Sequence, residues 1–171
     1  MNASHPAHGT PTPSDPQGAL QPPVLEYLAT LTIQVGPPQE VGDTPFGRRR
    51  VIPILGGQVS GPTLNGTVQA GGADYQSIRS DTFTDIHARY IIQTDQGETV
   101  YVENTGIRTG TAHDIAALAR GEPVDPARIY FRSLPRFETA APRLQWLNSR
   151  LFVGTGARYP DRVELTFYLI Q

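Results

Sequence analysis

The chain contains no cysteine and no lysine among its 171 residues, and each absence removes a class of chemistry. Without cysteine there is no disulfide framework, no thiolate nucleophile and no zinc knuckle. All 14 basic residues are arginine, so lysine Schiff bases, pyridoxal phosphate linkages and phosphate-loop lysines are excluded. We therefore expect no cofactor that depends on either side chain.

Long apolar runs and long runs of one charge are also missing. No stretch approaches about 18 consecutive apolar residues, and the first residues lack a signal-peptide pattern, which argues against a membrane partner. The formal net charge is −2. Because Arg48, Arg49 and Arg50 form the longest cationic run, we expect no nucleic-acid partner. Together with the missing cysteine, these features favour a cytoplasmic protein.

The composition divides the chain into a tail and one domain. Residues 1–23 are rich in Pro, Gly, Ser and Thr and nearly lack large apolar groups, so they are predicted to be a disordered tail. Residues 24–171 are predicted to form a single domain, which is long enough to build its own core.

Alternation of apolar and polar residues predicts that this domain consists mainly of strands. The clearest strand covers 84–94, and the turn Asp-Gln-Gly at 95–97 leads into a second strand at 98–103, which predicts a hairpin. The proline-rich segment 36–47 is predicted to be a loop. Further strands are predicted at 24–35, 48–55, 64–68, 128–134, 147–153 and 162–170.

One short helix is predicted after residue 110. Thr111 can cap it, Asp114 stands where a capping-box acid belongs, Ile115 and Leu118 give an apolar stripe, and Gly121 ends it. Seven or eight short strands with one short helix indicate an all-β, antiparallel fold, either a sandwich or a barrel.

Several motifs, in this order and spacing, carry a resemblance to a known family. They are Gly-Gly-Ala-Asp-Tyr-Gln at 71–76, Ala-Arg-Tyr at 88–90, Thr-Asp-Gln-Gly at 94–97, Tyr-Phe-Arg at 130–132, Pro-Arg-Phe-Glu-Thr at 135–139 and Trp-Leu-Asn at 146–148. Over residues 24–171 the chain resembles the family called domain of unknown function 3237. The resemblance implies a lipocalin-like antiparallel β-barrel. The chain has Tyr75 where the family commonly has Trp, and His87 where it commonly has an acid, so an imidazole replaces a carboxylate there.

Three candidate catalytic residues share one face of the strand 84–94, namely Asp85, His87 and Arg89. One face of this strand must meet the core and the other either solvent or a polar cavity, and the alternation leaves both open. If the polar stripe lines a cavity, His87 is a general acid or base oriented by Asp85, and Arg89 holds an anionic oxygen.

Two further catalytic candidates follow the glycine pair at 71–72. Asp74 stands where the backbone can approach a ligand, and Tyr75, like Tyr90, offers a phenol to a developing oxyanion. A buried ion pair of Arg89 with Asp74 or Asp85 is the structural alternative, and a metal site built on the two aspartates is another.

The substrate-binding candidates are spread over the remaining chain: Tyr90, Arg132, Phe137, Trp146 and Asn148. A surface salt bridge among Arg132, Arg136 and Glu138 and a tryptophan plug at the barrel end are the structural alternatives.

These residues predict a barrel that binds a small hydrophobic organic molecule, without metal or cofactor. It would be a cofactor-independent acid/base enzyme, such as an isomerase, cyclase, dehydratase or lyase. The alternatives are a lipocalin-like carrier or sensor without chemistry, and a structural oligomeric protein with a filled lumen. A homodimer is expected because such barrels leave apolar outer faces. Both ligand-binding hypotheses require the stripe of Asp85, His87 and Arg89 to face a cavity.

Overall fold

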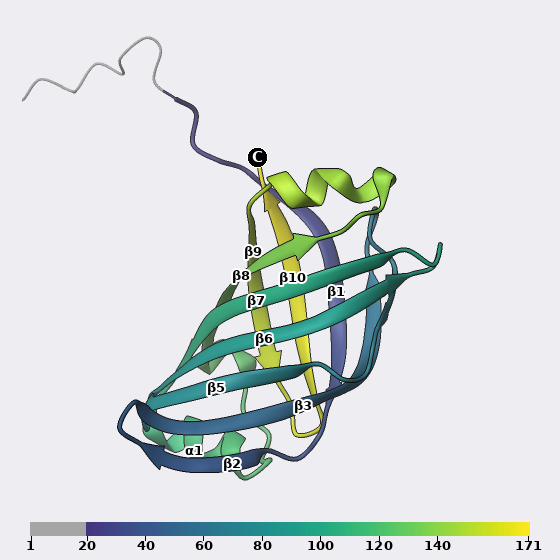
Figure 1. Cartoon of the computed structure of the whole chain (residues 1–171). Coiled ribbons are helices and arrows are strands. Elements are labelled where there is room, and N and C mark those ends of the chain that lie inside the picture. The colour runs from purple at the N-terminus through teal and green to yellow at the C-terminus, as the bar shows by residue number, and fades with distance from the viewer. Residues whose placement is uncertain (1–19) are drawn as a thin grey trace, which may run out of the picture.

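The computed structural model describes residues 20–171, in which ten strands form one antiparallel sheet (Figure 1). The strands are β1 (Leu25–Val35), β2 (Gln39–Thr44), β3 (Gly47–Ser60), β4 (Gly66–Val68), β5 (Ala73–Ser80), β6 (Phe83–Thr94), β7 (Thr99–Thr109), β8 (Tyr130–Glu138), β9 (Phe152–Arg158) and β10 (Arg162–Ile170). The disordered tail predicted for 1–23 falls almost entirely outside the described residues.

The sheet closes on itself as an eight-stranded barrel. Pairing runs in the order β1, β10, β9, β8, β7 and β6, and the wall is completed because β1 also pairs with β3. The short strands β4 and β5 share one position, since each pairs with both β3 and β6. Strand β2 extends β3 as an outer hairpin. The predicted all-β barrel is therefore confirmed.

The strand boundaries correct several expectations. The segment 36–47 was predicted to be a loop, but β2 forms there because its backbone pairs with residues 47–51 of β3. Strand β3 continues through the glycines at 56 and 57, where Gly56 has a φ of 142° and the register of β1 against β3 shifts by one residue. The first part of the strand predicted at 147–153 is instead the 3₁₀ helix η2 (Pro142–Ser149), and β9 begins at Phe152.

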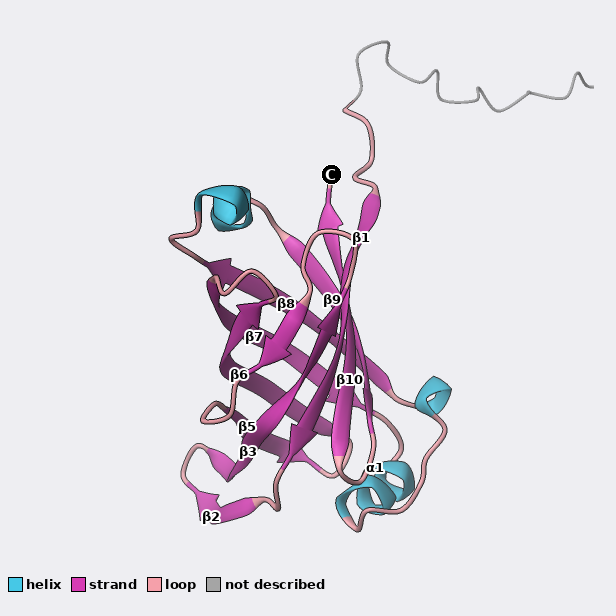
Figure 2. Cartoon of the chain, turned by 90° about the vertical axis from the view of Figure 1, so that its right-hand side faces the viewer, coloured by secondary structure: helices cyan, strands magenta, loops and turns pink. Residues whose placement is uncertain are grey.

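Helical segments lie at both ends of the barrel, with α1 (Ala112–Ala119) at one end and η2 at the other (Figure 2). The predicted helix is present as α1, and the Thr111 hydroxyl accepts from the Asp114 backbone N–H as a capping residue should. The short 3₁₀ segment η1 (Pro126–Arg128) follows it. At the other end, η2 inserts Leu144 and Leu147 into the core. In the described part of the chain, no helix is long and apolar enough to cross a membrane.

The barrel interior is apolar at the η2 end and partly polar at the α1 end. Toward η2 it is apolar and densely packed, with Phe167, Ile92, Val100 and Val102 showing no exposed surface. Phe137 packs edge-on against Phe152, with ring centroids 4.8 Å apart. Toward α1, polar side chains enter the lumen from β3, β5, β7 and β9. This polar end contains the candidate site.

Candidate functional site

A small cavity of about 40 Å³ lies inside the barrel, in the half that α1 covers. Its walls combine apolar groups such as Ile33, Ile86, Phe131 and Leu165 with polar ones. The polar lining residues are Asp74, Gln76, Tyr90, Asn104, Arg108 and Arg158. The cavity has room for about three water molecules, since one water needs roughly 10–15 Å³ of such space.

A row of side chains across three strands explains why the cavity is there. Asp74 on β5 is opposite Ala88 on β6, and Ala88 is opposite Asn104 on β7. Side chains opposite each other on adjacent strands point to the same face. The methyl group of Ala88 is the smallest of the three, so space remains between the carboxylate and the amide.

Four polar atoms of the lining have no hydrogen-bond partner within residues 20–171. They are Gln76 Oε1, Tyr90 Oη, Asn104 Oδ1 and Arg108 Nε. Buried polar groups in native proteins are nearly always paired with protein, water or ligand. The side chains that carry these four atoms all line one internal space, so this space is suited to a polar guest or to ordered water.

Asp74 is held firmly within this lining. Its Oδ2 accepts a hydrogen bond from Gln76 Nε2 at 2.6 Å, and its Oδ1 accepts from the His87 backbone N–H at 3.1 Å. Burial nevertheless raises the pKa of Asp74 above its ordinary value, against the opposing effect of these hydrogen bonds. The carboxyl is therefore easier to protonate than a free aspartate, which suits it to proton transfer.

Tyr90 presents a neutral phenol to the lumen. The residue is 3% exposed, and burial strongly raises the pKa of its hydroxyl. A phenol that does not ionise acts as a hydrogen-bond donor or acceptor and not as a base. Tyr90 can therefore orient an oxygen of a guest molecule.

Three arginines gather at the α1 end of the cavity. Arg108 and Arg158 line both the lumen cavity and a second cavity of about 30 Å³, whose wall also includes Arg50 and the α1 residues Ile115 and Leu118. Helix α1 thus covers this end of the lumen, with the guanidinium groups lying beneath it.

These three guanidinium groups differ in their partners. Arg50 lies 3.8 Å from Glu40, and Arg158 donates to the backbone oxygen of Arg162. Among the described residues no carboxylate forms an ion pair with Arg108; Asp74 acts on it only at longer range. Burial lowers the pKa of Arg108 to about 10, so it stays charged at neutral pH. The lumen therefore contains a buried positive charge without a direct partner.

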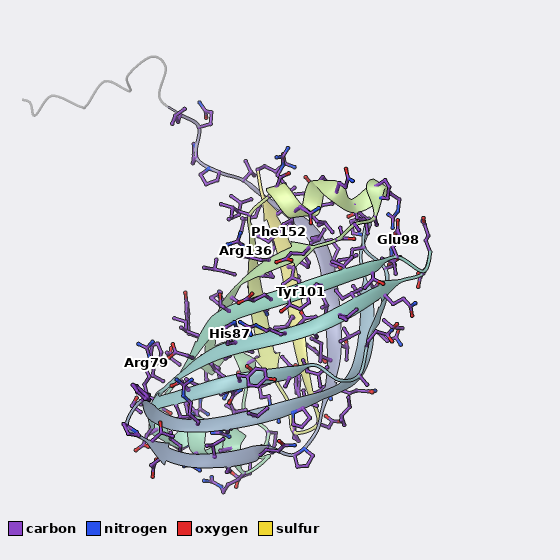
Figure 3. All side chains as sticks on the ribbon, in the orientation of Figure 1. Arg79, His87, Glu98, Tyr101, Arg136 and Phe152 are labelled. Carbon is purple, nitrogen blue, oxygen red and sulfur yellow. The ribbon has the colours of Figure 1, made fainter. Side chains whose placement is uncertain are left out.

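The stripe of Asp85, His87 and Arg89 lies on the outside of the barrel, where Figure 3 labels His87, and this is one of the two orientations that the alternation left open. The physical reason is that Ile86, Ala88, Tyr90 and Ile92 are the buried face of β6. His87 Nε2 lies 2.6 Å from Glu103 Oε1 on β7, and both side chains are partly exposed. Hydrogen bonding to His87 lowers the pKa of Glu103.

The expected buried ion pair of Arg89 with an aspartate is also absent from the described residues. Arg89 contacts Glu103 at 3.4 Å, and Asp85 pairs with Arg79. Asp85 and His87 instead line an open groove of about 540 Å³ on the outer wall, together with Tyr75, which is 50% exposed. Of the five predicted catalytic residues, Asp74 lines the lumen cavity and the other four face outward.

The predicted substrate-binding residues are dispersed. Tyr90 lines the cavity, whereas Phe137 packs in the apolar half. Arg132 lies on the outer face over the ring of Tyr130. Trp146 is partly buried and packs against the core from η2, with its ring centroid 6.1 Å from that of Phe152. Asn148 is exposed and bonds twice to the Thr139 backbone, which fixes a turn.

Two of the structural alternatives, a salt bridge to Glu138 and a metal site, are not found within residues 20–171. Neither Arg132 nor Arg136 forms a salt bridge with Glu138 in this part of the chain. Likewise, the described residues contain no group of three or more His, Asp or Glu side chains placed to hold a metal ion.

Sequence reasoning missed Gln76, Asn104 and Arg108. The signal was present, because Asn104 and Arg108 alternate in step with the apolar Val100 and Val102 on β7. The same period of two that predicted the strand thus places an amide and a guanidinium on its buried face.

The chain was compared with known proteins. A family model described as "Protein of unknown function (DUF3237)" matches residues 23–170. A UPF0311 protein of Rhodopseudomonas palustris is 47% identical over 150 residues, covering 86% of this chain and 98% of the relative. The crystal structure of a β-barrel-like protein from Acinetobacter baumannii is 36% identical, with a TM-score of 0.79, covering 91% of this chain and all of the other. An enzyme from Penicillium herquei is similar in fold, with 22% identity and a TM-score of 0.66 over 90% of this chain and 98% of that one.

Proposed function

The chain belongs to the DUF3237 family, and we propose that it binds a small organic molecule in the α1 half of its lumen. The observation that carries this proposal is that four side chains, each with a buried polar atom that has no partner in the described chain, line one internal cavity. Leaving such groups unpaired costs about 1–3 kcal/mol each, and a guest that pairs them recovers part of that cost.

The lining also indicates the shape of the guest. Ile33, Ile86, Phe131 and Leu165 offer an apolar wall, and Tyr90 with its polar neighbours offers hydrogen bonds. A cavity that binds benzene measures about 150 Å³, which is larger than the 40 Å³ found here. The guest is therefore small, or its entry displaces α1 from the end of the barrel.

Acid/base catalysis on the guest is the more specific form of this proposal. Asp74 has the raised pKa of a proton-transfer group, and Tyr90 can donate to an oxygen that gains charge. The Penicillium neighbour, described as an enzyme, is consistent with a barrel of this shape hosting a reaction. The enzyme and carrier hypotheses drawn from the sequence required the stripe of Asp85, His87 and Arg89 to face a cavity, and they fail in that form because the stripe faces outward. The present proposal depends on Asp74 and Tyr90 instead. A carrier without chemistry requires the same cavity and differs in leaving its guest unchanged.

A paired substitution tests the binding step. Tyr90→Phe removes the inward phenol, while Tyr101→Phe removes a hydroxyl from β7, where Tyr101 alternates with the buried Val100 and Val102. A library of small organic molecules is screened by ligand-observed NMR against the full chain and both variants. We expect members whose affinity falls about fivefold in Tyr90→Phe, the value of one hydrogen bond, and is unchanged in Tyr101→Phe. If no bound molecule depends on Tyr90, the lumen is not a binding site.

Turnover separates the enzyme from the carrier. The molecules bound by the wild type are incubated with it, and their NMR spectra are followed for new signals. We expect conversion by the wild type and none by Asp74→Asn, which keeps an acceptor for the His87 N–H but cannot transfer a proton. Unchanged guests, or equal conversion by Asp74→Asn, would favour the carrier.

A further inference from the structure

The positive charge at the α1 end of the lumen indicates which chemical class of guest would bind there. Resting on the proposed function, we infer that the guest is an organic acid whose carboxylate lies against Arg108 beneath α1. Arg108 is 6% exposed, lines both internal cavities and has an Nε atom without a hydrogen-bond partner in the described chain.

The balance of charge favours an anion over a neutral guest. Arg50, Arg108 and Arg158 lie around this end of the lumen, whereas Asp74 is the one carboxylate that lines either cavity. Arg50 lies near Glu40, whereas within residues 20–171 neither Arg108 nor Arg158 has a carboxylate at ion-pair distance. Arg158 is partly exposed and donates to a backbone oxygen, so Arg108 is the more deeply buried of these two guanidinium groups. A charged group buried without a partner attracts an opposite charge strongly, because little solvent screens the pair.

The shape of the donors favours a carboxylate. The planar guanidinium offers parallel N–H groups that match the two oxygens of a carboxylate. The apolar groups around it, Ile52 and Val163 among them, would contact a hydrocarbon body attached to that head group. A small acid with an apolar end fits both features.

Asp74 does not oppose this placement. Its two oxygens already accept hydrogen bonds from Gln76 and from the His87 backbone, and once it is protonated it no longer repels an anion. Burial raises the pKa of Asp74, and an arriving anion would raise it further. Binding of a carboxylate would then be accompanied by proton uptake at Asp74.

The test compares propionate with its neutral isostere propionamide on the full chain. Each probe is titrated at constant ionic strength while the arginine Nε–H signals are recorded by NMR, and the Arg108 signal is identified by its absence from Arg108→Met. We expect propionate to shift this signal saturably, with an affinity at least about tenfold higher than that of propionamide. In Arg108→Met we expect this preference to vanish.

Arg136→Met provides the matched control, because Arg136 is an exposed arginine on the outer face of β8. We expect it to leave the affinity for propionate unchanged. If both probes bind equally in the wild type, or if Arg136→Met loses as much affinity as Arg108→Met, the inference of an anionic guest is overturned while binding in the lumen stands. If neither probe binds saturably, and no library member depends on Tyr90, both proposals fall.

Discussion

The two halves of the barrel interior differ in polarity and in how densely they are packed. The half next to η2 is filled by aliphatic and aromatic side chains, among them Phe167, Val100 and Leu144, with almost no exposed surface. The half next to α1 contains Arg108, Tyr90 and other polar groups around a cavity. A domain needs one well-packed core to fold, so the η2 half can supply the stability that the α1 half gives up. Such an arrangement is typical of a binding site placed within a stable scaffold.

The largest effect is expected in the apolar half. Phe167→Ala removes a ring that has no exposed surface and that packs against Phe137 at 5.9 Å between centroids. We expect the free energy of unfolding to fall by about 3–5 kcal/mol, measured by urea denaturation. Phe46→Ala is the control, since Phe46 is 82% exposed, and should change it by no more than about 0.5 kcal/mol. Equal losses in both variants would show that the packed half is not the stabilising one.

A pH-dependent effect is expected in the polar half. The pKa of Asp74 is higher in the folded state than its ordinary 3.8, so the folded protein holds its proton more tightly than the unfolded chain. The stabilisation is present below the unfolded pKa and is lost as pH rises through the folded pKa. The unfolding free energy of Asp74→Asn relative to the wild type should therefore increase from about pH 4 to pH 7. A difference that is constant with pH would contradict the assigned burial of this carboxyl.

A smaller effect is expected from the phenol. Tyr90→Phe removes a buried hydroxyl that has no partner in the described chain, so its loss leaves no protein group unpaired. We expect the free energy of unfolding to stay the same or to increase, in either case by less than about 1 kcal/mol. A loss of 2 kcal/mol or more in denaturant unfolding would mean that the hydroxyl has a structural partner.

The smallest effect is expected on the outer wall. His87→Ala breaks an exposed contact with Glu103, and such contacts contribute about 0–1 kcal/mol. Its unfolding free energy and its binding of guests should both match the wild type. Loss of guest binding in this variant, measured by ligand-observed NMR, would indicate that the binding site is the outer groove and not the lumen.

The barrel could be predicted from the sequence because its strands alternate clearly. Strand β10 has the predicted bounds, and α1 follows the capping residue Thr111 as expected. The 36–47 segment was not predictable in this way, because β2 depends on pairing with β3 and not on its own residue pattern. Likewise η2 is fixed by Leu144 and Leu147 inserting into the core, which is a tertiary effect.

The site was only half predictable. Asp74 was selected because it follows a glycine pair and Tyr90 because its phenol can donate to an oxyanion, and both line the cavity. His87 was selected for its chemistry, although the apolar face of the same strand is the one that packs inward. The convergence of Asn104 and Arg108 with Asp74 depends on the register of β5, β6 and β7, and single-strand patterns do not fix that register.

The most direct test is the stability of Arg108→Met without any added ligand. Burial lowers the pKa of Arg108 to about 10, so keeping this buried group charged costs on the order of a few kcal/mol. We predict that methionine, which fills similar space without charge, raises the free energy of unfolding at pH 7 by about 1–3 kcal/mol. A fall in the free energy of unfolding of 2 kcal/mol or more would show that Arg108 stabilises the fold. It would contradict the claim that the polar half of the lumen lowers the stability of the barrel.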